Sequence, residues 1–482
     1  MPDALSFVEH FVVLMLENRS FDHMLGWLKQ DDPQIDGLTG TESNPLLPAD
    51  PSSPTVQVTN TAGFGDPDVD PGHDLLDVNE QLFGSRTVPA GASPTNLGFV
   101  ANYAHKRQQS GKAQGSGANI MRCFAAARLP VLTALAREFA LCDHWFSSVP
   151  GPTWPNRFFI HCGWSGGHYD NKFRFYGMRT VYEQLEAKKC TWRIYRHGSF
   201  GQSFLLTHLQ DASRAENFQR IGDFYRAAAK GRLPHYSFIE PDYFGGDAND
   251  QHPPHDVRHG DALIARVYEA VRRSPAWERS LLLVTYDEHG GIYDHVAPPA
   301  GPQFIPNPKH DPDFDFSRLG VRVPAVIVSP YIPKGTVDHT VYDHTSVPAT
   351  LTKRFGLPGR LSRRVAQANT FEQALSLAQP RSDTPETVMS PALAAARRAP
   401  STLPLSDLQL ALVEAAQNLE AVLLKGTKPA ALGAMAAAAP AAARPLTRTQ
   451  AGRYVNRVGA ALLARAPRAT APQRPRARRR RK

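Results

Sequence analysis

The sequence has 482 residues, of which 42% are hydrophobic and 21% are charged, and this composition is typical of a globular protein with a sizeable core. No apolar run is long enough to span a membrane, and four widely spaced cysteines argue against a disulfide framework or a zinc finger. The formal charge of +9 is concentrated near the end of the chain, because residues 444–482 hold thirteen Arg and Lys and no acid. The N-terminus lacks the pattern of a cleaved secretion signal, which predicts a cytoplasmic location by default and leaves export by another route open.

Five short runs rich in Val, Ile, Leu and Tyr predict strands that are buried on both faces, and they are, in chain order, 10–17, 192–197, 235–243, 281–288 and 323–332. Helical periodicity is clearest in 129–143 and 259–278. The stretch 38–72 is rich in Pro, Thr, Asp and Gly, which predicts a long loop able to cover a site. This alternation predicts an α/β fold with a central, mostly parallel sheet between helices.

The composition divides the chain into three parts. Residues 1–380 carry the α/β pattern and form the expected main domain. Residues 381–443 are rich in Ala, Pro and Leu, and 405–424 predicts one amphipathic helix within them. Residues 444–482 are rich in Arg, and we expect this tail to be disordered, because like charges repel and little apolar surface is available for burial.

Polar side chains directly follow two of the predicted strands. Glu17 and Asn18 end the first apolar run, and Asp287 and Glu288 end the fourth. In open parallel sheets, ligands bind outside the carboxyl ends of the strands. Uncompensated buried carboxylates cost several kcal/mol each, so the adjacent acids predict a hard cation. Behind the first strand a plain capped turn is the alternative, in which Asn18 and Asp22 cap the next helix.

The stretch SSVPGPTWPNRFF, 147–159, predicts a helix that begins near Thr153, since proline just inside a helix start is preorganised for that position. The free amides and the positive dipole end of a helix favour an anion such as phosphate. Asn156 and Arg157 are then the nearest further donors for phosphate oxygens. The alternative is that Thr153 serves only as an N-cap hydroxyl.

Histidines and acids gather in two further stretches. DPGHDLLDVNEQ contains His73, and NDQHPPHDV, which follows a predicted strand, contains His252 and His255. Any one of these histidines is more often a surface residue than a participant in chemistry. Because the second group stands at the end of a strand, one or two of its members become candidates for proton transfer.

Five stretches together resemble a known family: LMLENRSFDHMLG, PGPTWPNRFF, NDQHPPHDV, TYDEHGGIYDHV and YDHTSVPATLTKRFGLP. In order and spacing they are similar to the bacterial phosphoesterase family that includes non-hemolytic phospholipase C and acid phosphatase A. The resemblance covers about residues 5–375, and it implies an alkaline-phosphatase-like fold with 1–380 as the phosphoesterase catalytic domain. The low-complexity, basic C-terminal extension is not part of the shared core.

The resemblance also implies a metal centre and a nucleophile. Glu17, Asn18, Asp287 and Glu288 match metal ligands of the family, and Thr153 matches the nucleophile beside the metal. The implied cofactor is one hard cation, namely calcium, magnesium, manganese or ferric iron, because the ligands are oxygen-rich.

The remaining implied residues are histidines. His73 and His252 match histidines near the phosphoryl group, and His252 fits this position better than His255. His197, in a looser motif, is a weaker catalytic candidate, and His344 belongs to a family motif to which we assign no chemical role.

The activity that the resemblance implies is metal-dependent hydrolysis of phosphate esters through a covalent phospho-threonine, of the phospholipase C or acid phosphatase type. The residues leave open whether the substrate is a phosphomonoester, a phospholipid or another phosphodiester. A function of another class also stays open, in which the Arg-rich tail binds nucleic acid or an anionic membrane. The tail would otherwise be only solubilising.

Overall fold

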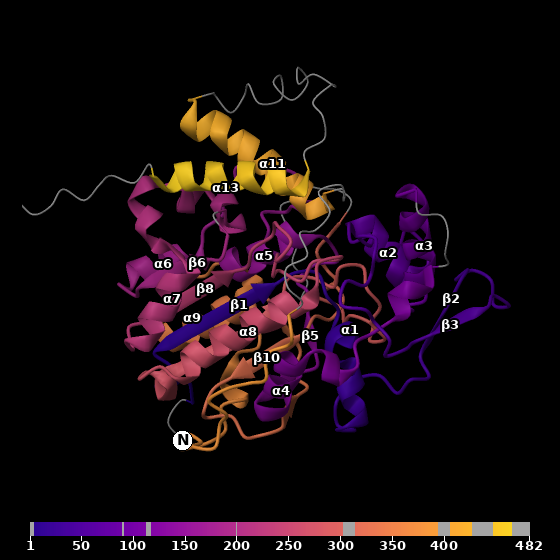
Figure 1. Ribbon diagram of the computed structural model, residues 1–482, viewed down its shortest axis with the longest axis horizontal. Coiled ribbons are helices and arrows are strands. Elements are labelled where there is room, and N and C mark those ends of the chain that lie inside the picture. Colours follow the sequence, from indigo (N-terminus) through magenta and orange to yellow (C-terminus); the bar gives the residue numbers. More distant parts are fainter. Residues whose placement is uncertain are drawn as a thin grey trace, which may run out of the picture.

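The computed structural model describes residues 4–88, 91–111, 117–198, 200–301, 314–393, 405–426 and 447–464. Its central element is an eight-stranded sheet with the strand order β11-β4-β10-β9-β1-β8-β6-β7, in which β1 (His10–Leu16) is an inner strand (Figure 1). The other strands of this sheet are β4 (Ala140–Cys142), β6 (Trp192–Arg196), β7 (Phe218–Arg220), β8 (Tyr236–Glu240), β9 (Ser280–Tyr286), β10 (Ala325–Val328) and β11 (Thr336–Asp338).

The sheet is mostly parallel. Strand β1 pairs in parallel with both β8 and β9, and β10 is antiparallel to its two neighbours, β9 and β4. Every residue from Phe11 to Leu16 is buried, as expected for a strand that is covered on both faces. The predicted central, mostly parallel sheet is therefore confirmed. The sequence did not reveal the short strands β4, β7 and β11, which have too few residues to show a hydrophobic pattern.

Helices cover both faces of the sheet. One group consists of α4 (Pro130–Glu138), α7 (Ile221–Ala229) and α8 (Val257–Arg272). The opposite group consists of α5 (Thr153–Cys162), α6 (Val181–Ala187), α9 (Ser346–Phe355) and α10 (Arg363–Gln367). The two helices predicted from periodicity correspond to α4 and α8.

Further elements lie at the end of the molecule toward which β1 points (Figure 1). They are α1 (Phe21–Leu25), α2 (Leu75–Phe83), α3 (Phe99–Gln109) and the hairpin of β2 (Ser43–Pro45) and β3 (Thr55–Gln57). The hairpin lies inside the stretch 38–72, so the expectation of a long loop holds only in part there. Strands β5 (Trp145–Phe146) and β12 (Tyr342–Asp343) form a separate parallel pair.

Two C-terminal helices pack on the main domain. Helix α11 (Asp407–Leu419), followed by a π-helical turn (Glu420–Leu424), lies within the stretch that predicted an amphipathic helix, and α13 (Arg448–Ala464) packs beside it (Figure 1). Leu408, Leu412 and Val455 are buried in the same core as the residues of the sheet. The boundary near residue 380 stays a prediction.

The expected disorder of 444–482 is wrong for the part that forms α13. Val455, Val458 and Leu462 repeat at helical spacing and are buried against the rest of the protein, which compensates for the high Arg content. Residues 465–482, which hold nine of the thirteen basic residues of the tail, lie outside the described residues. Among the helices that the structure describes, none is both long and apolar enough to cross a bilayer.

Candidate active site

The ends of β1 and β9 bring together the side chains that the sequence singled out as cation ligands. Leu16 and Tyr286 are partners in the parallel ladder, so the chain leaves both strands at the same place. Directly beyond them, the Asn18 N–H donates to Asp287 Oδ1 at 3.0 Å. Four polar side chains are fully buried here: Glu17, Asn18, Asp287 and Glu288.

The backbone around Asn18 is unusual. Asn18 has a φ of 51°, and Gly290 has a φ of 65°. A Cβ on Gly290 would lie 2.4 Å from the Asn18 carbonyl oxygen, so only glycine permits this close approach of the two loops. The N-cap of α1 is Ser20, whose Oγ accepts the His23 N–H at 3.2 Å. The alternative in which Asn18 caps that helix is therefore wrong.

Thr153 is the first residue of α5, as the sequence predicted, and its side chain is directed at the carboxylates. Its Oγ1 donates to Glu17 Oε2 at 3.4 Å, and Thr153 is fully buried. The N-cap of α5 is Pro152, and no side chain of the N-cap bonds to the helix. The alternative of a capping hydroxyl is therefore wrong, and the Thr153 hydroxyl is left for the site.

The protein does not satisfy the polar atoms of this cluster by itself. Asn18 Oδ1, Asp287 Oδ2 and Glu288 Oε1 are buried and have no hydrogen-bond partner among the described residues. Burial raises the pKa of Glu17, and burial together with the charge of Asp287 raises the pKa of Glu288 to about 8. Three carboxylates and an amide oxygen are a donor set that hard cations prefer. By donor type these residues therefore suit the predicted cation. Among the described residues, however, the group that brings three His, Cys, Asp or Glu ligand atoms within 4.8 Å of one another is a different one, Asp22, Asp294 and His295.

Arg157 supplies the positive charge inside this cluster. It is buried, forms an ion pair with Glu17 through Nη2, and its Nε lies 3.6 Å from Asp287 Oδ2. One guanidinium offsets only part of the charge of three neighbouring carboxylates. Arg157 Nε and Nη1 have no hydrogen-bond partner among the described residues, and phosphate binding by Arg157 stays a prediction.

Asn156 holds the loop in front of the nucleophile candidate. Its Oδ1 accepts the Val149 N–H at 3.0 Å. Its Nδ2 donates to the carbonyl oxygens of Gly151 and Pro152 at 2.9 and 3.1 Å. Because these carbonyls occupy both N–H bonds of the amide, this geometry does not support the predicted contact of Asn156 with phosphate and gives it a role in shaping the loop.

His73 and His252 lie beside the carboxylates, with their ring centroids 6.0 Å apart. The Nδ1 of each ring lies within hydrogen-bond distance of a proline carbonyl, at 2.9 Å for His73 and 2.7 Å for His252. Since a carbonyl only accepts, each Nδ1 carries the proton and each Nε2 is the other reactive atom. Burial lowers the pKa of His73, but the nearby negative charges, Glu288 first, raise it overall to about 10.

The two other histidine candidates differ in position. His255 adjoins His252, at 6.4 Å between ring centroids, and its Nδ1 lies 2.6 Å from Asp250 Oδ1. His197 hydrogen-bonds through Nδ1 to the side chain of Asn249. In the described part of the chain no contact joins His197 to the carboxylates, so the structure brings His255 into the histidine group and not His197.

Three residues outside the predicted set support the site. Gln202 donates to Glu17 Oε1 at 2.8 Å, His344 Nε2 donates to the Asp287 carbonyl at 2.6 Å, and His289 Nδ1 lies 3.4 Å from Glu288 Oε2. His289 directly follows the paired acids, which is a local signal. Gln202 lies in a turn that no periodic pattern distinguishes, so the sequence offers no signal for it.

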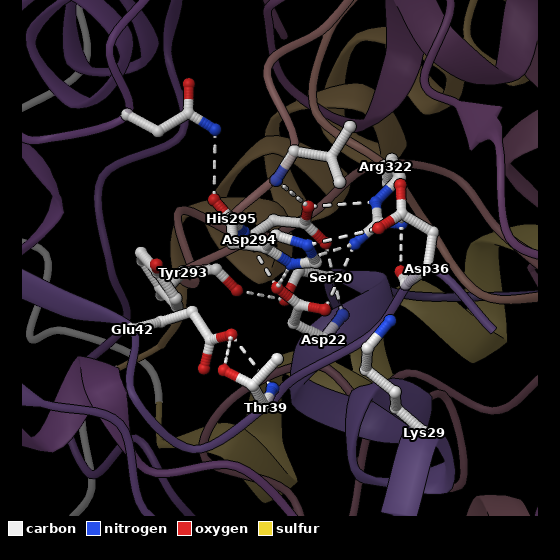
Figure 2. A network of polar contacts seen from close by, with 12 residues as sticks. Ser20, Asp22, Lys29, Asp36, Thr39, Glu42, Tyr293, Asp294, His295 and Arg322 are labelled. Atoms are coloured by element: carbon white, nitrogen blue, oxygen red, sulfur yellow. Dashed lines mark hydrogen bonds and ion pairs between the residues drawn. The ribbon is translucent and has the colours of Figure 1, made fainter. Parts of the chain in front are cut away.

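A second buried cluster contains Asp22, Asp294 and His295, whose ligand atoms lie within 4.8 Å of one another (Figure 2). Here Arg322 already provides the counter-charge, because its Nη2 lies 3.0 Å from Asp22 Oδ1 and its Nε 2.9 Å from Asp294 Oδ1. The acids of this cluster are therefore satisfied by protein groups, in contrast to those around Asn18.

Helix α11 reaches the loops that carry the histidines. The Asp407 N–H donates to Asp70 Oδ2 at 3.2 Å, and Gln409 Nε2 lies 3.4 Å from His255 Nε2. The same Gln409 amide donates to the Tyr243 carbonyl at 2.9 Å. The C-terminal extension therefore contacts the site, although in the sequence it comes after the part of the chain that carries the α/β pattern.

Comparison with known proteins identifies the family of this chain. The profile of the Phosphoesterase family matches residues 8–358. Non-specific phospholipase C1 of Arabidopsis thaliana is 40% identical over 402 residues, which cover 79% of this chain and 73% of that protein. Non-specific phospholipase C3 of the same plant is 39% identical over 453 residues, which cover 88% of this chain and 84% of that protein. Phospholipase C B of Mycobacterium tuberculosis (strain ATCC 25618 / H37Rv) is 29% identical over 409 residues, with 74% and 75% covered.

Solved structures similar to this chain include a protein in the alkaline phosphatase superfamily from Vibrio parahaemolyticus, with 11% sequence identity and a TM-score of 0.31 over 50% of this chain and 64% of that chain. The family match spans most of the chain and includes both strand ends of the site and Thr153. The chain thus belongs to the Phosphoesterase family, and it is an enzyme that hydrolyses phosphoric esters.

Proposed function

We propose that this enzyme is a metal-dependent phospholipase C that uses Thr153 as its nucleophile and passes through a covalent phospho-threonine. One observation carries the proposal. The Thr153 hydroxyl bonds to Glu17 inside a buried cluster where Asn18, Asp287 and Glu288 each retain a side-chain oxygen without a partner among the described residues.

Glu17, Asn18, Asp287 and Glu288 would hold one hard cation, for which calcium, magnesium, manganese and ferric iron are the candidates. When bound, such a cation lowers the pKa of a nearby hydroxyl and offsets the charge of a phosphate. The raised pKa values of Glu17 and Glu288 indicate buried, crowded carboxylates with too little positive charge around them, which supports this assignment.

The first chemical step forms the bond from Thr153 Oγ1 to phosphorus and breaks the bond from phosphorus to the leaving alcohol oxygen. Glu17 Oε2 already accepts the hydrogen bond of the Thr153 hydroxyl and is placed to take its proton. The leaving oxygen takes a proton from His73 or His252, through Nε2, because the Nδ1 of each is bonded to a backbone carbonyl.

The second step regenerates the enzyme. A water attacks the phosphorus of phospho-Thr153, and a histidine Nε2 accepts the proton of the water. The bond from phosphorus to Oγ1 breaks, Thr153 Oγ1 takes back the proton that Glu17 accepted in the first step, and the product is a phosphomonoester. A phospholipid substrate would yield diacylglycerol in the first step and the phosphorylated headgroup in the second.

The names of the relatives support a phospholipid rather than a phosphomonoester as substrate. An acid phosphatase acting on monoesters is the second candidate. The two are distinguished by comparing turnover of phosphatidylcholine, p-nitrophenyl phosphorylcholine and p-nitrophenyl phosphate with each candidate cation. Hydrolysis of the monoester alone would make the enzyme a phosphatase.

The nucleophile is tested with Thr153→Ala and Thr153→Ser. We expect Thr153→Ala to lower turnover by at least about a thousandfold, because no other hydroxyl replaces the one bonded to Glu17, whereas Thr153→Ser retains measurable turnover. Mass spectrometry of acid-quenched Thr153→Ser during turnover should detect the phosphorylated peptide.

Thr133→Ala is a matched control, since Thr133 is also buried and its Oγ1 donates only to carbonyl oxygens, at 2.7 and 3.2 Å. It should lower the melting temperature and keep turnover. Full turnover in Thr153→Ala would exclude Thr153 as the nucleophile.

A further inference from the structure

A cleft of about 920 Å³ opens beside His73. One wall comes from the main domain and includes Leu75, Leu76 and the segment 169–172. The facing wall comes from α11 and includes Leu410 and Glu414. Because His73 itself lines the cleft, the cleft adjoins the candidate active site.

Two leucines at this cleft are exposed to an unusual degree. Leu76 is 49% exposed and Leu410 is 53% exposed, one on each wall. Few other large apolar side chains in the described part of the chain are as exposed as Leu76 and Leu410, and both of these border the same cleft. A pair of exposed apolar side chains on the two walls of a cleft beside a site indicates an apolar ligand.

The charged groups of the cleft do not indicate that an anion binds there. Arg86 pairs with Asp77 at 2.8 Å, and both Arg174 and Lys172 pair with Asp170. Asp407 and Glu414 add negative charge on the α11 wall. Since the arginines are already paired with acids and the leucines are not covered, the cleft suits the uncharged part of a ligand better than a second phosphate or a polyanion.

Resting on the proposed function, we propose that this cleft binds the acylglycerol part of the phospholipid, with Leu76 and Leu410 as specificity-determining residues. The phosphate then lies at the inner end, near His73 and Thr153, and the acyl chains extend between α2 and α11. The family match ends at residue 358, so the α11 wall is contributed from outside the matched region.

The test compares two substrates that share the reacting phosphodiester. Dihexanoyl phosphatidylcholine, used below its critical micelle concentration, has acyl chains, and p-nitrophenyl phosphorylcholine has none. For Leu76→Gln and Leu410→Gln we expect KM for the lipid to rise about tenfold per side chain, because each loses an apolar contact. The kcat/KM for p-nitrophenyl phosphorylcholine should change less than about twofold, since this substrate lacks that contact.

Leu47→Gln is the matched control, because Leu47 is a 60% exposed leucine on the β2–β3 hairpin and does not line the cleft. It should leave both substrates unchanged. Equal KM values for the lipid in wild type and in the Leu76→Gln/Leu410→Gln double variant would overturn the inference, as would an equal loss on both substrates.

A second readout separates this inference from the proposed function. Calorimetric titration of dihexanoyl phosphatidylcholine measures binding without turnover when the full-length proteins carry Thr153→Ala. If the Thr153→Ala protein binds the lipid and the protein that also carries Leu76→Gln/Leu410→Gln does not, the cleft assignment holds even if the wild type hydrolyses no phosphoester, and then the proposed function alone fails. If both bind alike, the cleft assignment fails, and turnover on p-nitrophenyl phosphorylcholine still decides the proposed function.

Discussion

Replacing Arg322 with Met should destabilise the protein strongly, because Arg322 is the counter-charge of two buried acids (Figure 2). Its guanidinium is fully buried and bonds to Asp22 and Asp294, and its Nη1 donates to the carbonyl oxygens of Asp36 and Asp143 at 2.7 and 2.9 Å. The guanidinium carbon of Arg322 lies 4.5 Å from the centre of the Phe21 ring. Met has a similar length, so we expect it to keep the packing against Phe21. The substitution therefore removes charge and hydrogen bonds and little volume.

The magnitude follows from what remains in place. Asp22 keeps His295, whose Nδ1 lies 2.6 Å away, whereas Asp294 loses its guanidinium partner. One uncompensated buried charge costs about 3–5 kcal/mol. At roughly 2 °C per kcal/mol for a large domain, the melting temperature should fall by about 6–10 °C. Because Asp22 and Asp294 follow the two strand ends that carry Asn18 and Glu288, we also expect weaker cation binding.

Thermal and urea unfolding of the purified variants measure this cost. The triple variant Arg322→Met/Asp22→Asn/Asp294→Asn should recover at least half of the loss, since no buried charge is then left alone. Arg137→Met is the control for an exposed pair, because Arg137 and Asp31 are both about half exposed, and it should cost less than about 1 kcal/mol. A triple variant as unstable as Arg322→Met would refute the reasoning.

In chelator at pH 9, Glu288→Gln should melt at a higher temperature than wild type, because it removes a carboxylate whose pKa burial raises to about 8. The variant should also lose turnover. A lower melting temperature would contradict the idea that the buried carboxylates destabilise the metal-free protein. Adding the correct cation at a hundred times its Kd should stabilise wild type by about 2.7 kcal/mol, and no thermal shift with any hard cation would exclude the metal. Burial lowers the pKa of His295, but Asp22 raises it overall to about 10. The free energy of unfolding should therefore fall between about pH 6.5 and pH 10, by at most about 1.4 kcal/mol per pH unit. His295→Gln should flatten this slope in urea titrations. Deleting residues 465–482 should abolish retention on heparin and keep turnover if the tail binds polyanions; unchanged retention would mark the tail as solubilising.

The central sheet and the carboxylate cluster could be predicted because their signals are local. Strands β1 and β9 are uninterrupted apolar runs, and the polar residues that end them share one edge once the strands are parallel neighbours. The start of α5 at Thr153 followed in the same way from the proline in its first turn. These signals place the acids at the strand ends and Thr153 at the helix start. Their roles as cation ligands and nucleophile follow from the family resemblance and stay predictions.

The contacts of the neighbouring side chains could not be predicted. A sequence shows that Asn156 can donate hydrogen bonds, but only the folded loop shows that carbonyl oxygens of residues 149–152 accept them. Gln202 and His344 reach Glu17 and Asp287 from distant parts of the chain. Helix α13 was missed because its Arg content dominates the composition, while its apolar stripe is visible only at helical spacing.

The position of α11 also has a consequence for biosynthesis. The chain leaves the ribosome N-terminus first, so β1, α5 and β9 emerge before the helix that forms the second wall of the cleft. At roughly 5–20 residues per second, α11 follows β9 only after several seconds. During that interval the nascent protein exposes Leu76 and the polar pocket behind it to solvent or to chaperones, and a chain truncated before α11 would keep that opening permanently.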